Sequence, residues 1–164
     1  EGWTKLYFGG ITYKLMAEAG IERTADGKSE KEFREKLRRD YGPECYAKFL
    51  EPDIKKALKK GDVVLDGLYS WYEYKYLIER FPELKLVCIV VDKALRYERV
   101  NNRIDRPFNR EDIMYRDVSE IENLAKGGPI AYSDYFLFNN GSLDDYHKRL
   151  LEILDDINKH EGVK

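Results

Sequence analysis

The chain has 164 residues and a mass of 19.4 kDa, with 29 basic residues, 31 acidic residues and a formal net charge of −2. A hydrophobic fraction of 43% with 13% aromatic residues excludes the disordered, collagen-like and low-complexity classes, and no apolar run reaches the ~20 residues of a membrane span. The near-balanced charge argues against a general nucleic-acid binder, and two cysteines, Cys45 and Cys88, are too few for a disulfide framework, so we expect a reducing, cytoplasmic setting without a membrane partner.

Hydrophobic periodicity and capping signals divide the chain into strands and helices. Short runs of β-branched and aromatic residues predict strands, and apolar residues at three- and four-residue spacing predict helices. In chain order we predict a strand at 4–8, helices at 11–19, 29–40 and 44–60, a strand at 62–66, a helix at 71–80, a strand at 84–91, helices at 94–104 and 109–125, a strand at 134–138 and a helix at 142–158. This alternation is typical of an α/β fold with a mostly parallel sheet.

Glycines and capping residues set the expected boundaries of these elements. Gly9 and Gly10 are predicted to end the first strand, the spacing of Ser29 and Glu32 predicts a capping box, and residues 126–129 are predicted to form a turn. The string G-x-x-x-x-G-K-[ST], which forms a phosphate-binding loop between a strand and a helix, occurs nowhere in the chain.

The acid that ends the second predicted strand is a candidate metal ligand. Asp66 follows the apolar run 63–65 and precedes Gly67. In open parallel sheets ligands bind beyond the carboxyl ends of the strands, where a carboxylate suits a hard cation such as Mg²⁺. An aspartate in this position can equally cap the following helix. The local pattern leaves both interpretations open.

An arginine-rich segment follows the third predicted strand. Arg96, Arg99 and Arg103 recur at three- and four-residue spacing, which places them on one face of the predicted helix, and Arg106 follows before Pro107. The planar fork of arginine binds phosphate oxygens in pairs, and a mobile arginine lid over a phosphoryl-transfer site has this pattern. A solvated helix face explains the same spacing.

Taken in order, several segments resemble the P-loop nucleoside monophosphate kinases, and within them the dephospho-CoA-kinase-like branch. The segments are Val63-Val-Leu-Asp-Gly67, Arg96 to Arg106-Pro107, Arg116-Asp117 with Glu120, Ile130-Ala-Tyr-Ser-Asp-Tyr135, Asn139-Asn-Gly-Ser142 and the turn Phe8-Gly9-Gly10. The resemblance covers nearly the whole chain and depends on the order and spacing of these segments. It implies a three-layer P-loop kinase-like fold in a single domain, residues 1–164, with a helical arginine lid at about 96–126.

The resemblance also implies an activity, which is ATP-dependent phosphotransfer with Mg²⁺ to a nucleotide-like or dephospho-CoA-like acceptor. Asp66 is implied to lie beside the metal ion and the transferred phosphate, and the lid arginines to stabilise charge in the transition state. The implied site residues are Asp66, Arg99, Arg103 and Arg106 for catalysis, Asn139, Asn140, Gly141 and Ser142 beside the adenine, and Phe8, Gly9, Thr12 and Tyr69 facing the acceptor.

The chain departs from the family pattern in two places. The family often has an arginine shortly after the Asp-Gly pair, where it holds the acceptor phosphate, whereas this chain has Leu68-Tyr69-Ser70. The chain also lacks the family's phosphate-binding loop, which follows a central first strand, and without that strand its neighbours would stand ~10 Å apart with unpaired backbone groups. We therefore expect either that the sequence is a fragment of a longer chain, or that the strands re-pair, or that another segment fills the gap. The alternative is a degenerate kinase-like domain that binds a partner or ligand without catalysis.

Overall fold

The computed structural model describes residues 2–24, 27–104 and 107–161. The chain divides into two compact units, Glu1–Pro82 and Glu83–Lys164. Each unit combines helices with a pair of parallel strands, so the expected α/β class and the parallel pairing of strands are confirmed. The three-layer arrangement and the single domain stay predictions.

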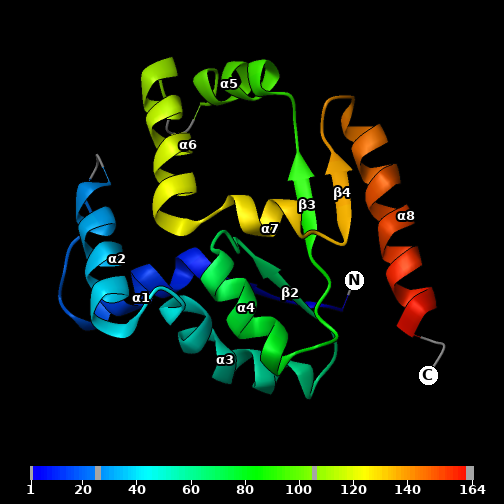
Figure 1. Ribbon diagram of the computed structural model, residues 1–164, viewed down its shortest axis with the longest axis horizontal. Helices are drawn as coiled ribbons and strands as arrows, with labels where there is room; N and C mark the ends of the chain where they lie inside the picture. The colour runs from blue at the N-terminus through cyan, green and yellow to red at the C-terminus, as the bar shows by residue number, and fades with distance from the viewer. Residues whose placement is uncertain (1, 25–26, 105–106, 162–164) are drawn as a thin grey trace. The chain divides into compact units, whose positions relative to one another are not determined.

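The first unit contains two strands and four helices, which are β1 (Thr4–Tyr7), α1 (Phe8–Glu18), α2 (Lys28–Tyr41), α3 (Cys45–Leu58), β2 (Val63–Asp66) and α4 (Trp71–Arg80) (Figure 1). The strands pair in parallel, with Thr4 opposite Val63 and Tyr7 opposite Asp66. Helix α3 contacts both strands as well as α1, α2 and α4, and it is therefore the centre of the unit. Its side chains Tyr46, Leu50 and Ile54 are buried.

The second unit is built in the same way from β3 (Val87–Val90), α5 (Lys93–Asn101), α6 (Arg110–Leu124), α7 (Gly127–Ala131), β4 (Tyr135–Phe138) and α8 (Leu143–Glu161). Strands β3 and β4 are parallel, with Val87 opposite Tyr135, and both point toward the same end of the unit (Figure 1). Helix α8 packs against β4, where Leu137, Ile153 and Ile157 form a buried cluster.

Two expectations about the starts of helices are wrong. Helix α1 begins at Phe8, so Gly9 and Gly10 lie inside it. The Tyr7 ring packs closely over Gly9, since a Cβ atom on Gly9 would lie 2.4 Å from that ring unless the tyrosine moved. Helix α2 begins at Lys28 without the predicted capping box, since the hydroxyl of Ser29 accepts from the backbone N–H of Thr24 instead.

The segment 126–129 does not remain a turn, because residues Gly127–Ala131 form the short helix α7. Helix α5 ends at Asn101, where consecutive asparagines favour termination, so Arg103 does not share a helix face with Arg96 and Arg99. The expectation that one helix carries all three arginines is therefore wrong.

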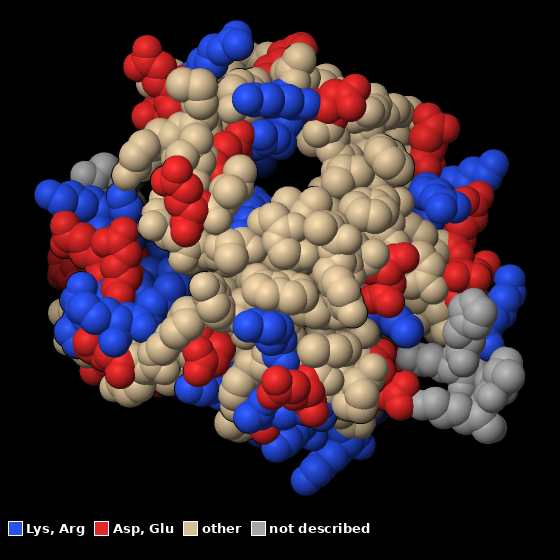
Figure 2. All heavy atoms as spheres, in the orientation of Figure 1, with Lys and Arg blue, Asp and Glu red and all other residues tan. Residues whose placement is uncertain are grey.

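The charged side chains are mixed in sign over the face drawn in Figure 2, where Lys and Arg alternate with Asp and Glu. This mixing agrees with the near-zero net charge of the sequence. Of the helices within the described residues, none is long and apolar enough to cross a membrane.

Candidate functional site

Most of the predicted site residues lie at the carboxyl ends of strands. Phe8 and Gly9 directly follow β1, Asp66 is the last residue of β2, and the segment 139–142 directly follows β4. The acceptor residues and Asp66 belong to the first unit, and the remaining described site residues belong to the second. Arg106 lies outside the described residues.

Asp66 forms an ion pair across the first strand pair. Its Oδ2 atom lies 2.7 Å from Nζ of Lys5, whose Cα faces Val64 two residues earlier on β2, so the two side chains share one face of the sheet. The hydrogen bond and the charge of Asp66 raise the pKa of Lys5. Both side chains are about half exposed or more, which leaves the Asp66 carboxylate accessible from solvent.

The ring of Tyr7 covers the ends of both strands in the first unit. It lies over Gly9, and its Cε2 atom would be 3.3 Å from a Cβ atom on Gly67. Gly67 adopts φ +91°, a conformation that favours glycine and turns the chain sharply after Asp66. Sequence reasoning missed Tyr7, although its place before two glycines was the available signal.

The predicted acceptor residues differ in accessibility. Phe8 and Thr12 are buried, and the Thr12 hydroxyl shares a hydrogen bond of 3.1 Å with the Tyr46 hydroxyl. Tyr69 is 48% exposed, in the loop between β2 and α4. Tyr69 is therefore accessible from solvent, whereas the Thr12 side chain is buried and links α1 to α3.

A buried carboxyl group on α4 was not identified from the sequence. Glu73 on α4 is 3% exposed, and burial raises its pKa to about 7 even though the charge of Arg38 and a hydrogen bond from the backbone N–H of Ser70 act in the opposite direction. Ser70 is the N-cap of α4 and accepts from the N–H of Tyr72. The capping-box spacing of Ser70 and Glu73 was the signal that could have found this pair.

The arginine segment has two different roles in the second unit. Arg96 makes two hydrogen bonds to Asp117, and the Tyr97 hydroxyl donates to the same carboxylate over 2.9 Å. These bonds lower the pKa of Asp117 and join α5 to α6. Arg99 instead donates to the backbone carbonyl and side chain of Asn139. Arg103 is exposed beyond the end of α5.

The loop after β4 is held by contacts with both neighbouring segments. The Asn140 side chain accepts from the backbone N–H of Asp92, which follows β3, over 2.9 Å. Ser142 caps α8 by accepting from the N–H of Asp145 and donating to its carboxylate. The structure therefore brings Arg99, Asn139 and Asn140 together at this end of the strands.

No group of three or more His, Cys, Asp or Glu side chains could hold a metal ion within the residues that the structure describes. Mg²⁺ is often bound through one carboxylate, waters and substrate phosphates, so a single accessible acid such as Asp66 has the oxygen ligand that this ion needs. Burial raises the pKa of the Cys45 thiol to about 11, which makes it a poor nucleophile.

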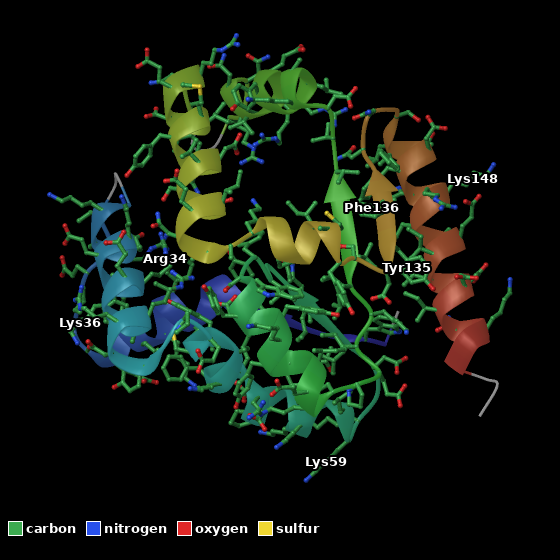
Figure 3. The ribbon with its side chains drawn as sticks, viewed as in Figure 1. Arg34, Lys36, Lys59, Tyr135, Phe136 and Lys148 are labelled. Atoms are coloured by element: carbon green, nitrogen blue, oxygen red, sulfur yellow. The ribbon has the colours of Figure 1, made fainter. Side chains whose placement is uncertain are left out.

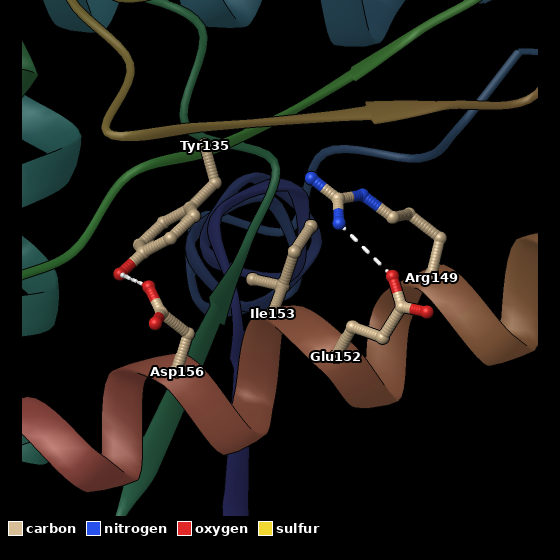
Figure 4. A pocket seen from close by; sticks show the side chains of 5 residues that line it. All are labelled: Tyr135, Arg149, Glu152, Ile153 and Asp156. Atoms are coloured by element: carbon tan, nitrogen blue, oxygen red, sulfur yellow. Dashed lines mark hydrogen bonds and ion pairs between the residues drawn. The ribbon is translucent and has the colours of Figure 1, made fainter.

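A surface hollow of about 300 Å³ lies between β4 and α8 (Figure 4). The Tyr135 hydroxyl donates to Asp156, Arg149 pairs with Glu152, and Ile153 lies between these two pairs. Its polar side chains are thus paired with one another, and none of the predicted site residues lines it.

No family model matches the chain. The chain is 30% identical over 162 residues to a UPF0200 protein of Thermococcus gammatolerans, a match that covers 96% of this chain and 84% of the relative. A UPF0200 protein of Thermococcus kodakarensis is also 30% identical over 162 residues, with 96% and 86% covered. A third, from Thermoplasma acidophilum, is 26% identical over 158 residues, with 94% and 83% covered.

Proposed function

Because this chain belongs to the UPF0200 family, whose printed names assign no activity, we propose from its residues that it is an ATP-dependent phosphotransferase acting on a nucleotide-like or dephospho-CoA-like acceptor. The observation that carries the proposal is the position of the assigned residues. Asp66, Phe8 and Asn139 each lie where a parallel strand ends, which is where ligands bind in open α/β sheets.

The proposal gives each assigned residue a role. Bound Mg²⁺ would supply charge that neutralises the phosphates of ATP. Asp66 would hold the ion or a water bound to it, and Tyr69 would face the acceptor. Arg99, Arg103 and Arg106 stabilise the charge on the transferred phosphoryl group, and residues 139–142 lie beside the adenine.

The phosphate-binding loop that this activity needs is a further part of the proposal. Within the described residues, β2 pairs with β1 and β3 pairs with β4. The match covers 84% of the Thermococcus gammatolerans relative.

The test uses the protein expressed with whatever residues its gene encodes upstream of Glu1. ADP release and phosphorylated product would be measured with MgATP and a panel of acceptors that includes nucleoside monophosphates and dephospho-CoA. We expect ATP binding that depends on Mg²⁺ and transfer to at least one acceptor. Failure of this extended chain to bind ATP would contradict the proposal.

A kinase-like binding domain without catalysis is the second candidate. It is favoured by the ion pair in which Lys5 already neutralises Asp66, and by Tyr69 standing in the region where the resembled family often has an arginine. Phosphotransfer by the wild-type protein that is lost in Asp66→Asn would exclude this candidate. Ligand binding that the same substitution leaves unchanged, with no turnover, would support it.

A further inference from the structure

Two arginines one turn apart on α2 lie close together in the first unit. Arg34 and Arg38 have the i, i+4 spacing of neighbours on one helix face, and the charges of both lower the pKa of the buried Tyr46 hydroxyl against the larger opposing effect of burial. Arg34 lies on the opposite side of α2 from Lys36, which points outward (Figure 3). Both arginines are partly buried.

The two guanidinium groups differ in what holds them. Arg38 stacks on the Tyr46 ring, 5.1 Å from its centroid, and its Nη2 atom lies 3.8 Å from the Glu73 carboxylate. Partly buried Arg34 makes no ion pair or hydrogen bond with any residue in the described ranges. Within the part of the chain that the structure describes, Glu73 contacts Arg38 but makes no ion pair with Arg34, and like charges one turn apart repel each other.

The contacts around Arg38 are also incomplete. Its Nε atom and the Oε1 atom of Glu73 are both buried without a hydrogen-bond partner among the residues described. Glu73 is 3% exposed, so this is a buried polar group whose hydrogen-bonding capacity is not used. The hydrogen bond between the Thr12 and Tyr46 hydroxyls joins α1 to α3.

We propose that Arg34 and Arg38 bind the phosphate dianion of a phosphomonoester ligand above the Thr12–Tyr46 hydrogen bond. The forked guanidinium group matches phosphate oxygens in pairs, and two such groups balance the two charges of a phosphomonoester. The anion also relieves the repulsion between the two arginines. Arg34, whose donors have no partner among the described residues, makes the larger part of the contact, while Arg38 is oriented by Tyr46 and Glu73.

The identity of the ligand as an acceptor rests on the proposed function. The arginine pair lies on the acceptor side, in the same unit as Phe8 and Thr12, and it supplies the positive charge that the sequence lacks after Asp66-Gly67. The acceptor class is then a phosphomonoester, such as a nucleoside monophosphate, rather than an uncharged alcohol. The anion site itself does not depend on any transfer of phosphate.

The test measures binding without ATP. Calorimetric titrations of the full chain with inorganic phosphate and with AMP would be compared for wild type, Arg34→Met and Arg39→Met. Arg39 is a matched control because it lies on the same helix, its side chain is 73% exposed and its ion pair with Asp40 is at 4.0 Å. We expect Arg34→Met to weaken binding by about tenfold or more, the usual effect of losing a charged hydrogen bond, and Arg39→Met to leave it unchanged.

Three results would overturn the site: no binding of either probe by wild type at millimolar concentration, equal binding by Arg34→Met and wild type, or equal losses in both variants. Tighter binding of AMP than of phosphate assigns the site to a phosphomonoester, whereas equal affinities assign it to phosphate alone and overturn the ligand class. Thermal unfolding of Arg34→Met checks that the fold is intact. If AMP binds through Arg34 but no ATP turnover occurs, the anion site stands and the proposed function fails.

Discussion

Lys5 and Asp66 lie on adjacent parallel strands with their charged atoms 2.7 Å apart, directly before the sharp turn at Gly67. The lysine fixes the position of the carboxylate at the end of the strand without burying it. A phosphate–metal complex approaching this end would meet one negative and one positive group, both accessible. Because this ion pair is exposed, a substitution of Asp66 can test its part in phosphotransfer with little effect on the stability of the fold.

Asp66→Asn is expected to abolish phosphotransfer if the proposed function holds. The amide keeps the size of the side chain but loses the charge that a hard cation requires. The ion pair with Lys5 is exposed, so thermal stability should change little. Asp62→Asn, just before the same strand, is the control and should keep wild-type turnover. Equal rates in wild type and Asp66→Asn would remove Asp66 from the mechanism.

Arg103→Ala is expected to lower kcat by a factor on the order of 10²–10³, the usual loss when one transition-state charge partner is removed. Because Arg103 is exposed and lies beyond the end of α5, its removal should leave the unfolding transition unchanged. Arg149→Ala on α8 removes an equally exposed arginine and is the control for net charge. Steady-state kinetics with saturating MgATP make the comparison. A wild-type kcat for Arg103→Ala would contradict the assignment of this residue to the lid.

The free energy of unfolding of wild type is expected to fall as the pH rises through the pKa of Glu73, and Glu73→Gln is expected to lack this fall. The pKa of Glu73 is raised from 4.5 to about 7 in the folded state, so folding binds this proton more tightly than the unfolded chain does. The stabilising contribution is full below the unfolded pKa and is lost as the pH rises through the folded pKa, an effect of about 3 kcal/mol.

Urea unfolding of both proteins at about pH 5 and about pH 8 measures this difference, because the effects of other carboxylates are common to both and cancel. Glu79→Gln, an exposed substitution on the same helix, should follow wild type at both values of pH. Parallel stability curves for wild type and Glu73→Gln would show that Glu73 is ionised across the whole range.

Asp117→Asn is expected to destabilise the second unit. The carboxylate accepts hydrogen bonds from Arg96 and Tyr97 and joins α5 to α6, and charged hydrogen bonds of this kind contribute about 1–2 kcal/mol at a partly exposed site. Asp155→Asn on the exposed side of α8 is the control. Chemical unfolding monitored by circular dichroism gives the comparison. An unchanged midpoint would mean that apolar packing alone holds the two helices together.

Local residue patterns were sufficient to predict the order of the elements and the places where strands end. The four strands were predicted near their observed positions because runs such as Val87–Val90 are apolar and β-branched, a local property. Asp66 was identified as a strand-end residue for the same reason. The start of α1 at Phe8 was not predicted, because two consecutive glycines usually interrupt regular structure.

Contacts between residues that are distant in the sequence depend on the tertiary structure. The pairs Lys5–Asp66, Arg38–Glu73 and Arg99–Asn139 join segments far apart in the chain, and no spacing in the sequence encodes them. They follow from the parallel register of the strands and from the packing of helices, both of which depend on contacts across the fold. Burial acts in the same way, because the pKa of Glu73 is set by the helices packed around it rather than by its neighbours in sequence.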